Sequence, residues 1–298
     1  MRRYFVTGGT GFIGRELVRQ LVSQDDTEMV VCLTRGLRTN RINHPKVLYW
    51  VGDIQNCPFP KRPFTDLIHG ANEVNDLLQP DQLRYYYTIV EGTNRVLKWA
   101  ATTGIQRTLI LSSGAVARDT LYGHAKRQSE ILASYYGENW STVPGQRTEI
   151  KIARIFSVIG PEMPLNGQYA AGRFVGMALE GEIRYYGGTS LRSYLDVQDC
   201  ARWLLHILGH ARAGIPVDVA GDDSIHIGEL AELTGTVFGV PVRKIDGPDR
   251  SDQYLPDLTL AKTLNLTQRI TLTQSLERIH AHYKARPDLR HPNLEPSA

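Results

Sequence analysis

Short apolar segments alternate with amphipathic segments over the first 155 residues of the chain. The apolar segments are rich in branched and aromatic residues and predict buried strands, as at Tyr4 to Val6. Between them, apolar residues recur every three or four positions, as in Phe12 to Ser23, and predict helices. Strands that alternate with helices indicate βαβ units and a parallel sheet. We therefore expect an α/β fold with a doubly wound parallel sheet.

The pattern changes near residue 160, where prolines and glycines interrupt the regular alternation. Before this point, strands are predicted at 4–6, 29–33, 47–51, 66–69, 107–113 and 149–155, and helices at 12–23, 81–103 and 121–136. After it, helices are predicted at 170–180, 199–209, 226–238 and 271–284, with strands at 183–186 and 194–197. We expect two domains, over residues 1–160 and 161–298. The second is a smaller lobe, of which about 194–222 is woven back onto the first domain.

Composition excludes several classes of protein. The 298 residues carry 34 Lys+Arg against 31 Asp+Glu, and without a basic block a net charge of +3 argues against nucleic-acid binding. No apolar run approaches the roughly 18 residues of a membrane span. The cysteines Cys32, Cys57 and Cys200 are far apart, which fits a reducing compartment and no zinc-site spacing. We expect a cytoplasmic protein that binds no metal, nucleic acid or membrane.

A glycine-rich turn, TGGTGFIG, leaves the first strand and opens the first helix. Gly8 permits the tight turn, Gly11 lets backbone N–H groups approach a pyrophosphate, and Gly14 permits close packing of the helix. This context predicts a Rossmann-type dinucleotide site. The predicted cofactor contacts in the turn are Gly8, Thr10, Gly11, Phe12 and Ile13.

A tyrosine and a lysine, Tyr122 and Lys126, open a helix directly after the strand that ends in Ser112 and Ser113. Residues four apart lie on one helix face, so the ammonium can approach the phenol and favour its phenolate. Tyr122 would then exchange a proton with a carbinol or carbonyl oxygen. A serine hydroxyl would bind the same oxygen, and Tyr122 and Lys126 would also contact the cofactor.

These motifs together resemble those of the extended short-chain dehydrogenase/reductase family. Besides the glycine turn, the similar segments are Gly52-Asp53-Ile54, Glu91-Gly92-Thr93, Arg154 to Pro161 and Arg192 to Asp199. The resemblance implies that Asp53 and Ile54 contact the adenine, and that Ser157 and Arg192 contact the substrate, with Arg192 on a diphosphate. The resemblance also selects Ser113 over Ser112 as the catalytic serine, because Val116 then takes the family's valine position.

The end of the second predicted strand bears on the choice of cofactor. It reads Thr34-Arg35, with Arg38 close behind and no acid to hold a ribose 2′-hydroxyl. A guanidinium can bind a 2′-phosphate, so NADP(H) is favoured over NAD(H), although Arg35 and Arg38 could also be solvated loop charges. Gly70 and Ala71, which follow the fourth strand, are expected beside the cofactor.

The resemblance implies an NAD(P)-dependent oxidoreductase that acts on a nucleotide sugar. An NADPH-dependent 4-ketoreductase leads, with a 4-epimerase that retains NAD and a reductase of small ketones or aldehydes as alternatives. A non-enzymatic scaffold is disfavoured by the complete serine, tyrosine and lysine set. A dehydratase is disfavoured because Gly114-Ala115 replaces its Asp-Glu pair.

Two further expectations concern binding. Arg173 either approaches the substrate or lies on a solvated helix face, and the sequence supports both equally. Residues 81–103 and 121–136 carry apolar side chains on more than one helical face, and in the resembled family these two helices form a dimer interface. We expect a homodimer.

Overall fold

The computed structural model describes all residues except 37–40, 72–81, 140–146, 166–168, 250 and 287–298. The chain divides into two compact units. The first unit comprises Met1–Ile155, Cys200–Val219 and Leu258–Leu266, and the second comprises Phe156–Asp199, Ala220–Asp257 and Thr267–Ala298. In the described part of the chain, no helix combines the length and the apolar character needed to cross a membrane.

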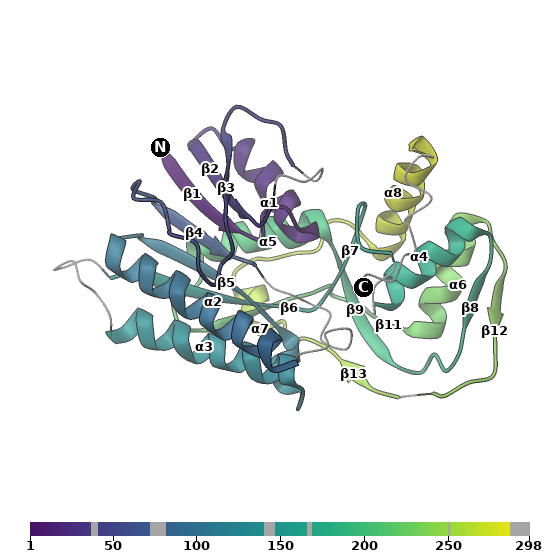
Figure 1. Ribbon diagram of the computed structural model, residues 1–298. Coiled ribbons are helices and arrows are strands. Elements are labelled where there is room, and N and C mark those ends of the chain that lie inside the picture. Colours follow the sequence, from purple (N-terminus) through teal and green to yellow (C-terminus); the bar gives the residue numbers. More distant parts are fainter. Residues whose placement is uncertain (37–40, 72–81, 140–146, 166–168, 250, 287–298) are drawn as a thin grey trace. The chain divides into compact units, whose positions relative to one another are not determined.

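A seven-stranded parallel sheet forms the first unit (Figure 1). Its strands are β1 (Arg2–Thr7), β2 (Thr27–Thr34), β3 (Val47–Val51), β4 (Asp66–His69), β5 (Arg107–Ser113), β6 (Glu149–Ile155) and β10 (Pro216–Val219). Their order is β10-β6-β5-β4-β1-β2-β3. This is the doubly wound, Rossmann-like arrangement that the alternating pattern predicts, so the expected fold class is confirmed.

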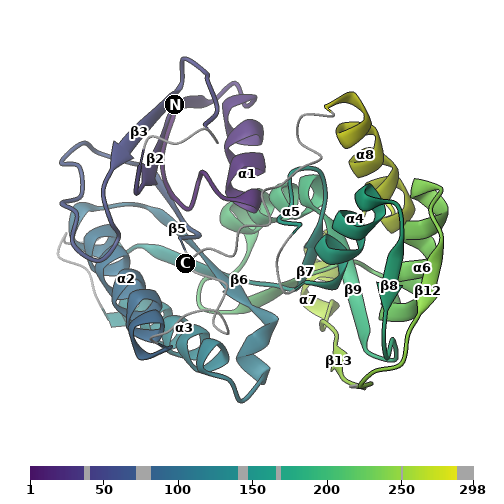
Figure 2. The same ribbon diagram turned by 45° about the vertical axis from the view of Figure 1, so that its right-hand side comes forward.

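Helices cover both faces of this sheet (Figure 2). They are α1 (Phe12–Val22), α2 (Gln82–Thr103), α3 (Leu121–Asn139), α5 (Val197–His210) and the short α7 (Thr259–Thr263). Leu97 of α2 and Tyr136 of α3 share one core cluster with Ile150 and Ile152 of β6. The alternate residue of that strand, Lys151, points to the other face and donates to the Leu208 carbonyl of α5 (2.8 Å). Successive side chains of β6 therefore contact the helices on opposite faces of the sheet.

The second unit is built around β9 (Leu191–Asp196), which pairs with three other strands. The remaining elements are β7 (Ser157–Ile159), β8 (Ile183–Tyr185), β11 (Ser224–His226), β12 (Val242–Lys244), β13 (Gln253–Tyr254), α4 (Ala170–Glu180), α6 (Ile227–Phe238) and α8 (Leu272–Ala285). Asp196, at the end of β9, accepts hydrogen bonds from Ser275 (2.7 Å) and Arg278 (2.6 Å) of α8. The strand begins at Leu191, so the prediction that it starts at Tyr194 was wrong.

Candidate active site

The carboxyl ends of β1 and β4 form the natural binding edge of the first unit. The strand order reverses between these neighbours, and in such sheets ligands bind outside the carboxyl ends at that point. The Gly70 N–H donates to the Thr7 carbonyl (3.0 Å), and the Ala71 N–H donates to the Thr7 hydroxyl (3.0 Å). The backbone that follows β4 is therefore fastened to the start of the glycine turn.

The glycine turn is closed so tightly that side chains would not fit. Gly8 has φ +76°, and a Cβ placed there would lie 2.6 Å from the carbonyl carbon of Gly70. A Cβ on Gly14 would overlap the Gly8 carbonyl oxygen, so α1 packs directly against the turn. The Gly11 N–H donates to that same oxygen (3.0 Å).

The amino end of α1 suits an anionic group. Gly11 is the N-cap residue, so no side chain caps the helix, and its first turn contains no acid. The first N–H groups of a helix lack intrahelical partners and carry partial positive charge. Such an end can hold a dinucleotide pyrophosphate, and Thr10, Phe12 and Ile13 are the residues expected to contact it.

The next strand ends bring together the other residues that are expected to bind the cofactor. The Gly52 N–H donates to the Thr34 carbonyl (2.9 Å), so the segments that follow β2 and β3 are adjacent. The Arg35 side chain is exposed, whereas Asp53 is half-buried and accepts the Gln55 N–H (2.8 Å). Ile54 packs against Gly92 of α2. Arg38 lies outside the described residues.

A buried hydrogen-bond chain links the glycine turn to α2, and the sequence pattern did not predict it. His69 Nδ1 lies 2.8 Å from the Thr7 hydroxyl, and its Nε2 lies 3.1 Å from the Thr93 hydroxyl, which donates to the Ile89 carbonyl. Thr93 must therefore accept from Nε2–H, and Thr7 must donate to Nδ1. Burial, with a contribution from the Lys126 charge, lowers the pKa of His69 to about 3, so this ring is neutral.

The predicted catalytic residues all lie in the first unit. Tyr122 and Lys126 occupy the first turns of α3, and the Lys126 Nζ lies 5.7 Å from the centre of the Tyr122 ring. Lys126 is 5% exposed and donates to the Leu111 carbonyl of β5 (2.8 Å). Its burial lowers its pKa to about 8, against the smaller opposing effect of Glu130. The ammonium is thus held where its charge acts on the phenol with little screening.

The two serines at the end of β5 have different surroundings. Ser113 is buried, and its hydroxyl accepts the Ala115 N–H (3.2 Å). Ser112 instead donates to Glu130 (2.5 Å), which also accepts both Nε (2.9 Å) and Nη2 (2.7 Å) of Arg154. Ser112 therefore supports the ion pair between Glu130 of α3 and Arg154 of β6.

Of the four predicted substrate residues, Ser113 lies in the first unit and the other three lie in the second. Ser157 is half-buried in β7, and Arg173 is an exposed residue of α4. Arg192 lies in β9, and its Nη2 contacts both carboxylate oxygens of Asp252 (2.7 and 3.0 Å). Its Nη1 donates to the Leu191 carbonyl (2.8 Å). The sequence carries no signal for this ion pair because its partners are sixty residues apart.

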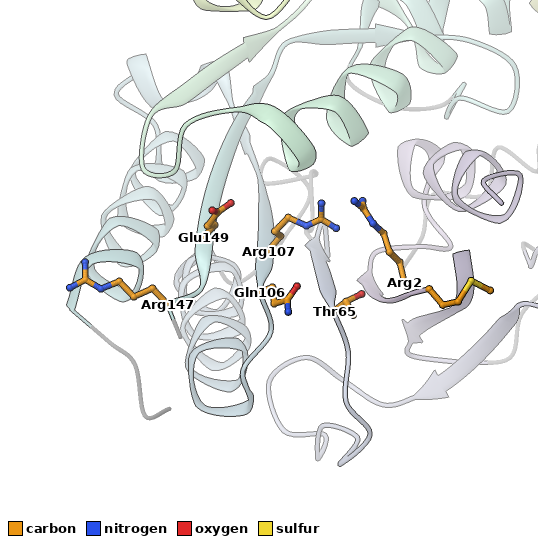
Figure 3. Close-up of a pocket in the computed structure, with 7 residues that line it drawn as sticks. Arg2, Thr65, Gln106, Arg107, Arg147 and Glu149 are labelled. Atoms are coloured by element: carbon orange, nitrogen blue, oxygen red, sulfur yellow. The ribbon is translucent and has the colours of Figure 1, made fainter. Parts of the chain in front are cut away.

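A cavity of about 420 Å³ lies at the opposite, amino-terminal edge of the first sheet (Figure 3). Its lining residues are Met1, Arg2, Thr65, Gln106, Arg107, Arg147 and Glu149. Arg107 forms an ion pair with the wholly buried Asp66, and Arg2 forms another with Asp26 (3.1 Å). These pairs tie the starts of neighbouring strands together, and the cavity is not part of the candidate active site.

Comparison with known proteins identifies the family of the chain. Residues 4–220 match the model of the NAD dependent epimerase/dehydratase family. The chain belongs to this family. The resemblance drawn from the motifs is thereby confirmed for most of the chain.

Individual relatives are distant but cover the chain almost completely. UDP-glucuronic acid decarboxylase 6 of Arabidopsis thaliana is 26% identical over 316 residues, which span 95% of this chain and 89% of the relative. A putative dihydroflavonol 4-reductase of Synechocystis sp. is 26% identical over 261 residues, 81% of this chain and 74% of the relative. The Bordetella bronchiseptica enzyme WbmF, solved with NAD+, shares the fold with a TM-score of 0.85 at 18% identity, covering 97% of this chain and 94% of that one.

Proposed function

We propose that this protein is an NAD(P)-dependent oxidoreductase that moves a hydride between a nicotinamide and an oxygen-bearing carbon of a nucleotide sugar. The observation that carries the proposal is the buried Lys126 beside Tyr122, in the unit whose glycine turn lies where the strand order reverses. The relatives support the substrate class, since decarboxylases named for UDP-glucuronic acid align with 95% of the chain.

The side chains of the site have distinct tasks in this chemistry. A bound nicotinamide supplies or accepts the hydride. Tyr122 donates its phenolic proton to the substrate oxygen as a carbonyl becomes a carbinol, and takes the proton back in the oxidative direction. The Lys126 ammonium stabilises the phenolate, and Ser113 donates a hydrogen bond to the same oxygen. One hydride and one proton complete the two-electron reduction.

Within this class we favour an NADPH-dependent 4-ketoreductase. Arg35 is exposed at the end of β2, where a guanidinium can bind a 2′-phosphate, and Thr34 to Gly36 contains no acid for a ribose hydroxyl. Gly114 and Ala115, directly after Ser113, offer no acid–base groups, which disfavours a dehydratase.

Three alternatives remain, two of which rest on particular relatives. A 4-epimerase would oxidise and then reduce its substrate and so retain NAD. A decarboxylase is favoured by the Arabidopsis relatives, which are named as UDP-glucuronic acid decarboxylases. A reductase of small ketones is favoured by the Synechocystis relative, which is named as a dihydroflavonol 4-reductase.

Mass spectrometry of the cofactor released from the purified protein tests these alternatives. Tightly retained NAD would support the epimerase, and an empty site that exchanges NADPH would support the ketoreductase. Arg35→Asp should weaken NADPH binding relative to NADH, because a carboxylate repels the 2′-phosphate. An unchanged ratio of the two dissociation constants would remove the argument for NADPH.

A further inference from the structure

The connection between β5 and α3 joins two residues of the proposed active site. Ser113 ends β5, and Leu121 begins α3 one residue before Tyr122. Between them lie only Gly114 to Thr120, including the 3₁₀ turn η2 (Gly114–Ala117). Whatever holds this short connection in place therefore also sets the position of the Ser113 hydroxyl relative to the Tyr122 phenol.

The connection lies directly against the first turns of α3. A Cβ on Gly123 would collide with the carbonyl oxygens of both Ala115 and Arg118. The Gly123 N–H donates to the Thr120 hydroxyl (3.0 Å), as at an N-cap. This close approach presents the carbonyls of the connection to side chains one turn further along the helix.

Arg127 uses that proximity. Its Nη1 donates to the carbonyls of Val116 (2.5 Å) and Arg118 (3.3 Å), and its Nη2 lies 3.0 Å from Nδ1 of His124. A guanidinium can only donate, so Nδ1 accepts, and the His124 proton resides on Nε2. That nitrogen donates to the Asp119 carboxylate (2.6 Å), which adds a side chain of the connection to the same group.

Arg127 is linked to Ser113 through the backbone, because the carbonyl that it binds and the N–H that Ser113 accepts belong to adjacent residues. Val116 follows Ala115, whose N–H donates to the Ser113 hydroxyl (3.2 Å). That N–H occupies one acceptor position of the hydroxyl and so restricts its orientation. Movement of η2 would release this bond and loosen that restriction.

We propose that Arg127 is a positioning residue, which clamps the Gly114–Thr120 connection to α3 and so keeps Ser113 and Tyr122 in register on one substrate oxygen. The proposal rests on the function proposed above. Arg127 touches neither reacting group of the chain, so its effect is exerted through the backbone of the connection.

Two measurements on Arg127→Met test the clamp. Without any substrate, hydrogen exchange of the amides in Gly114–Thr120 should accelerate at least about tenfold, because three donated bonds are lost. With NADPH and a UDP-4-keto-hexose as the probe, the rate of NADPH oxidation at 340 nm should fall about tenfold or more, since small misplacements of reacting groups are costly. The dissociation constant for NADPH should change less than twofold.

Two further variants guard against a general loss of structure. Arg127→Lys keeps the charge but cannot reach both carbonyls and His124 together, so it should give a smaller loss in both measurements. Lys98→Met removes an exposed positive charge from α2 and should match the wild type. Exchange and rate within twofold of wild type for Arg127→Met would overturn the proposal.

The failure of this inference can be told from failure of the function. If Tyr122→Phe abolishes NADPH oxidation by the UDP-4-keto-hexose while Arg127→Met leaves it intact, the positioning role alone is wrong. If the wild type oxidises no NADPH, or Tyr122→Phe oxidises it at the wild-type rate, the proposed chemistry fails and the positioning role with it.

Discussion

Burial of Lys126 sets the pH range in which the candidate site is correctly charged. The ammonium is enclosed between α3 and β5, which lowers its pKa from 10.5 to about 8. Since the charged form supports the Tyr122 phenolate, turnover should fall as the pH rises through about 8. The pH profile of kcat checks this, and in Lys126→Arg, whose charge persists, any remaining activity should lack that alkaline limb. A wild-type profile that stays flat to pH 10 would contradict the role of Lys126.

Tyr122 provides the most direct test of the chemistry. Tyr122→Phe removes only the phenolic oxygen, and the ring that packs near Tyr85 (6.4 Å between centres) is retained. Loss of a general acid–base group typically costs about 10²–10⁴-fold in rate. We expect a loss of this size in kcat with the NADPH dissociation constant nearly unchanged, measured by fluorescence titration. Turnover within a few-fold of wild type would refute the assignment.

His69 makes folding sensitive to acid. The folded protein holds the ring neutral, with a pKa of about 3, whereas the unfolded chain takes up a proton near pH 6.5. The unfolded state therefore binds more protons between these values, so stability falls with decreasing pH by up to about 1.4 kcal/mol per unit. Urea unfolding of His69→Gln should show lower stability at pH 7 but a shallower loss toward pH 4.5. Parallel curves for both proteins would show that His69 does not titrate in this way.

At the scale of elements, α2 and α3 combine a buried face with exposed apolar residues. Their buried sides meet the sheet, yet four large apolar side chains remain exposed. These are Leu83 (61% exposed), Tyr87 (56%), Ile131 (59%) and Tyr135 (49%). Covering such a surface is a common reason for a two-fold dimer. This supports the homodimer proposed from the sequence.

Charge placed on that surface should dissociate the dimer. Ile131→Glu would bury a carboxylate in the proposed interface, so sedimentation at tens of micromolar should show a monomer where the wild type is a dimer. Leu48→Glu, at a comparably exposed position of β3, should leave the wild-type mass unchanged. A monomeric wild-type protein would refute the interface.

At the scale of the whole molecule, the proposed function requires the second unit to bind the diphosphate of a nucleotide sugar. Its Arg192 is paired with Asp252, so a substrate diphosphate would have to compete with that carboxylate. Charge-assisted bonds to a guanidinium are worth about 1.5–3 kcal/mol each. UDP, dTDP or CDP should therefore raise the melting temperature of the wild type, and Arg192→Ala should abolish the shift. Asp252→Asn should bind the same diphosphate more tightly.

The outcome of this experiment also separates the substrate classes. If no nucleoside diphosphate at millimolar concentration shifts the wild-type melting temperature, the nucleotide-sugar proposal fails and a small-ketone reductase becomes the better interpretation. A shift that survives in Arg192→Ala would instead show that Arg192 serves only to join β9 to β13, with which it pairs.

The sequence by itself determined most of the architecture of the first unit. Strands β3, β4, β5 and β6 have the predicted bounds. The central β4 and β5 are buried on both faces and contain continuous apolar runs, whereas β6 shows the alternation typical of a strand. The glycine turn and the tyrosine–lysine pair could also be predicted from the sequence. Both depend on geometry within a few consecutive residues, so the local pattern contains the information.

Only the tertiary structure decided the features that join distant segments. Strands such as β11, β12 and β13 are two or three residues long and exist through pairing, so no periodicity can predict them. His69 between Thr7 and Thr93, and Arg192 against Asp252, depend on side chains that are adjacent only after folding. Burial then changes their chemistry, because removal from water favours the neutral histidine and lowers the pKa of Lys126. Local sequence thus specified which groups the site contains, and packing specified their charges and partners.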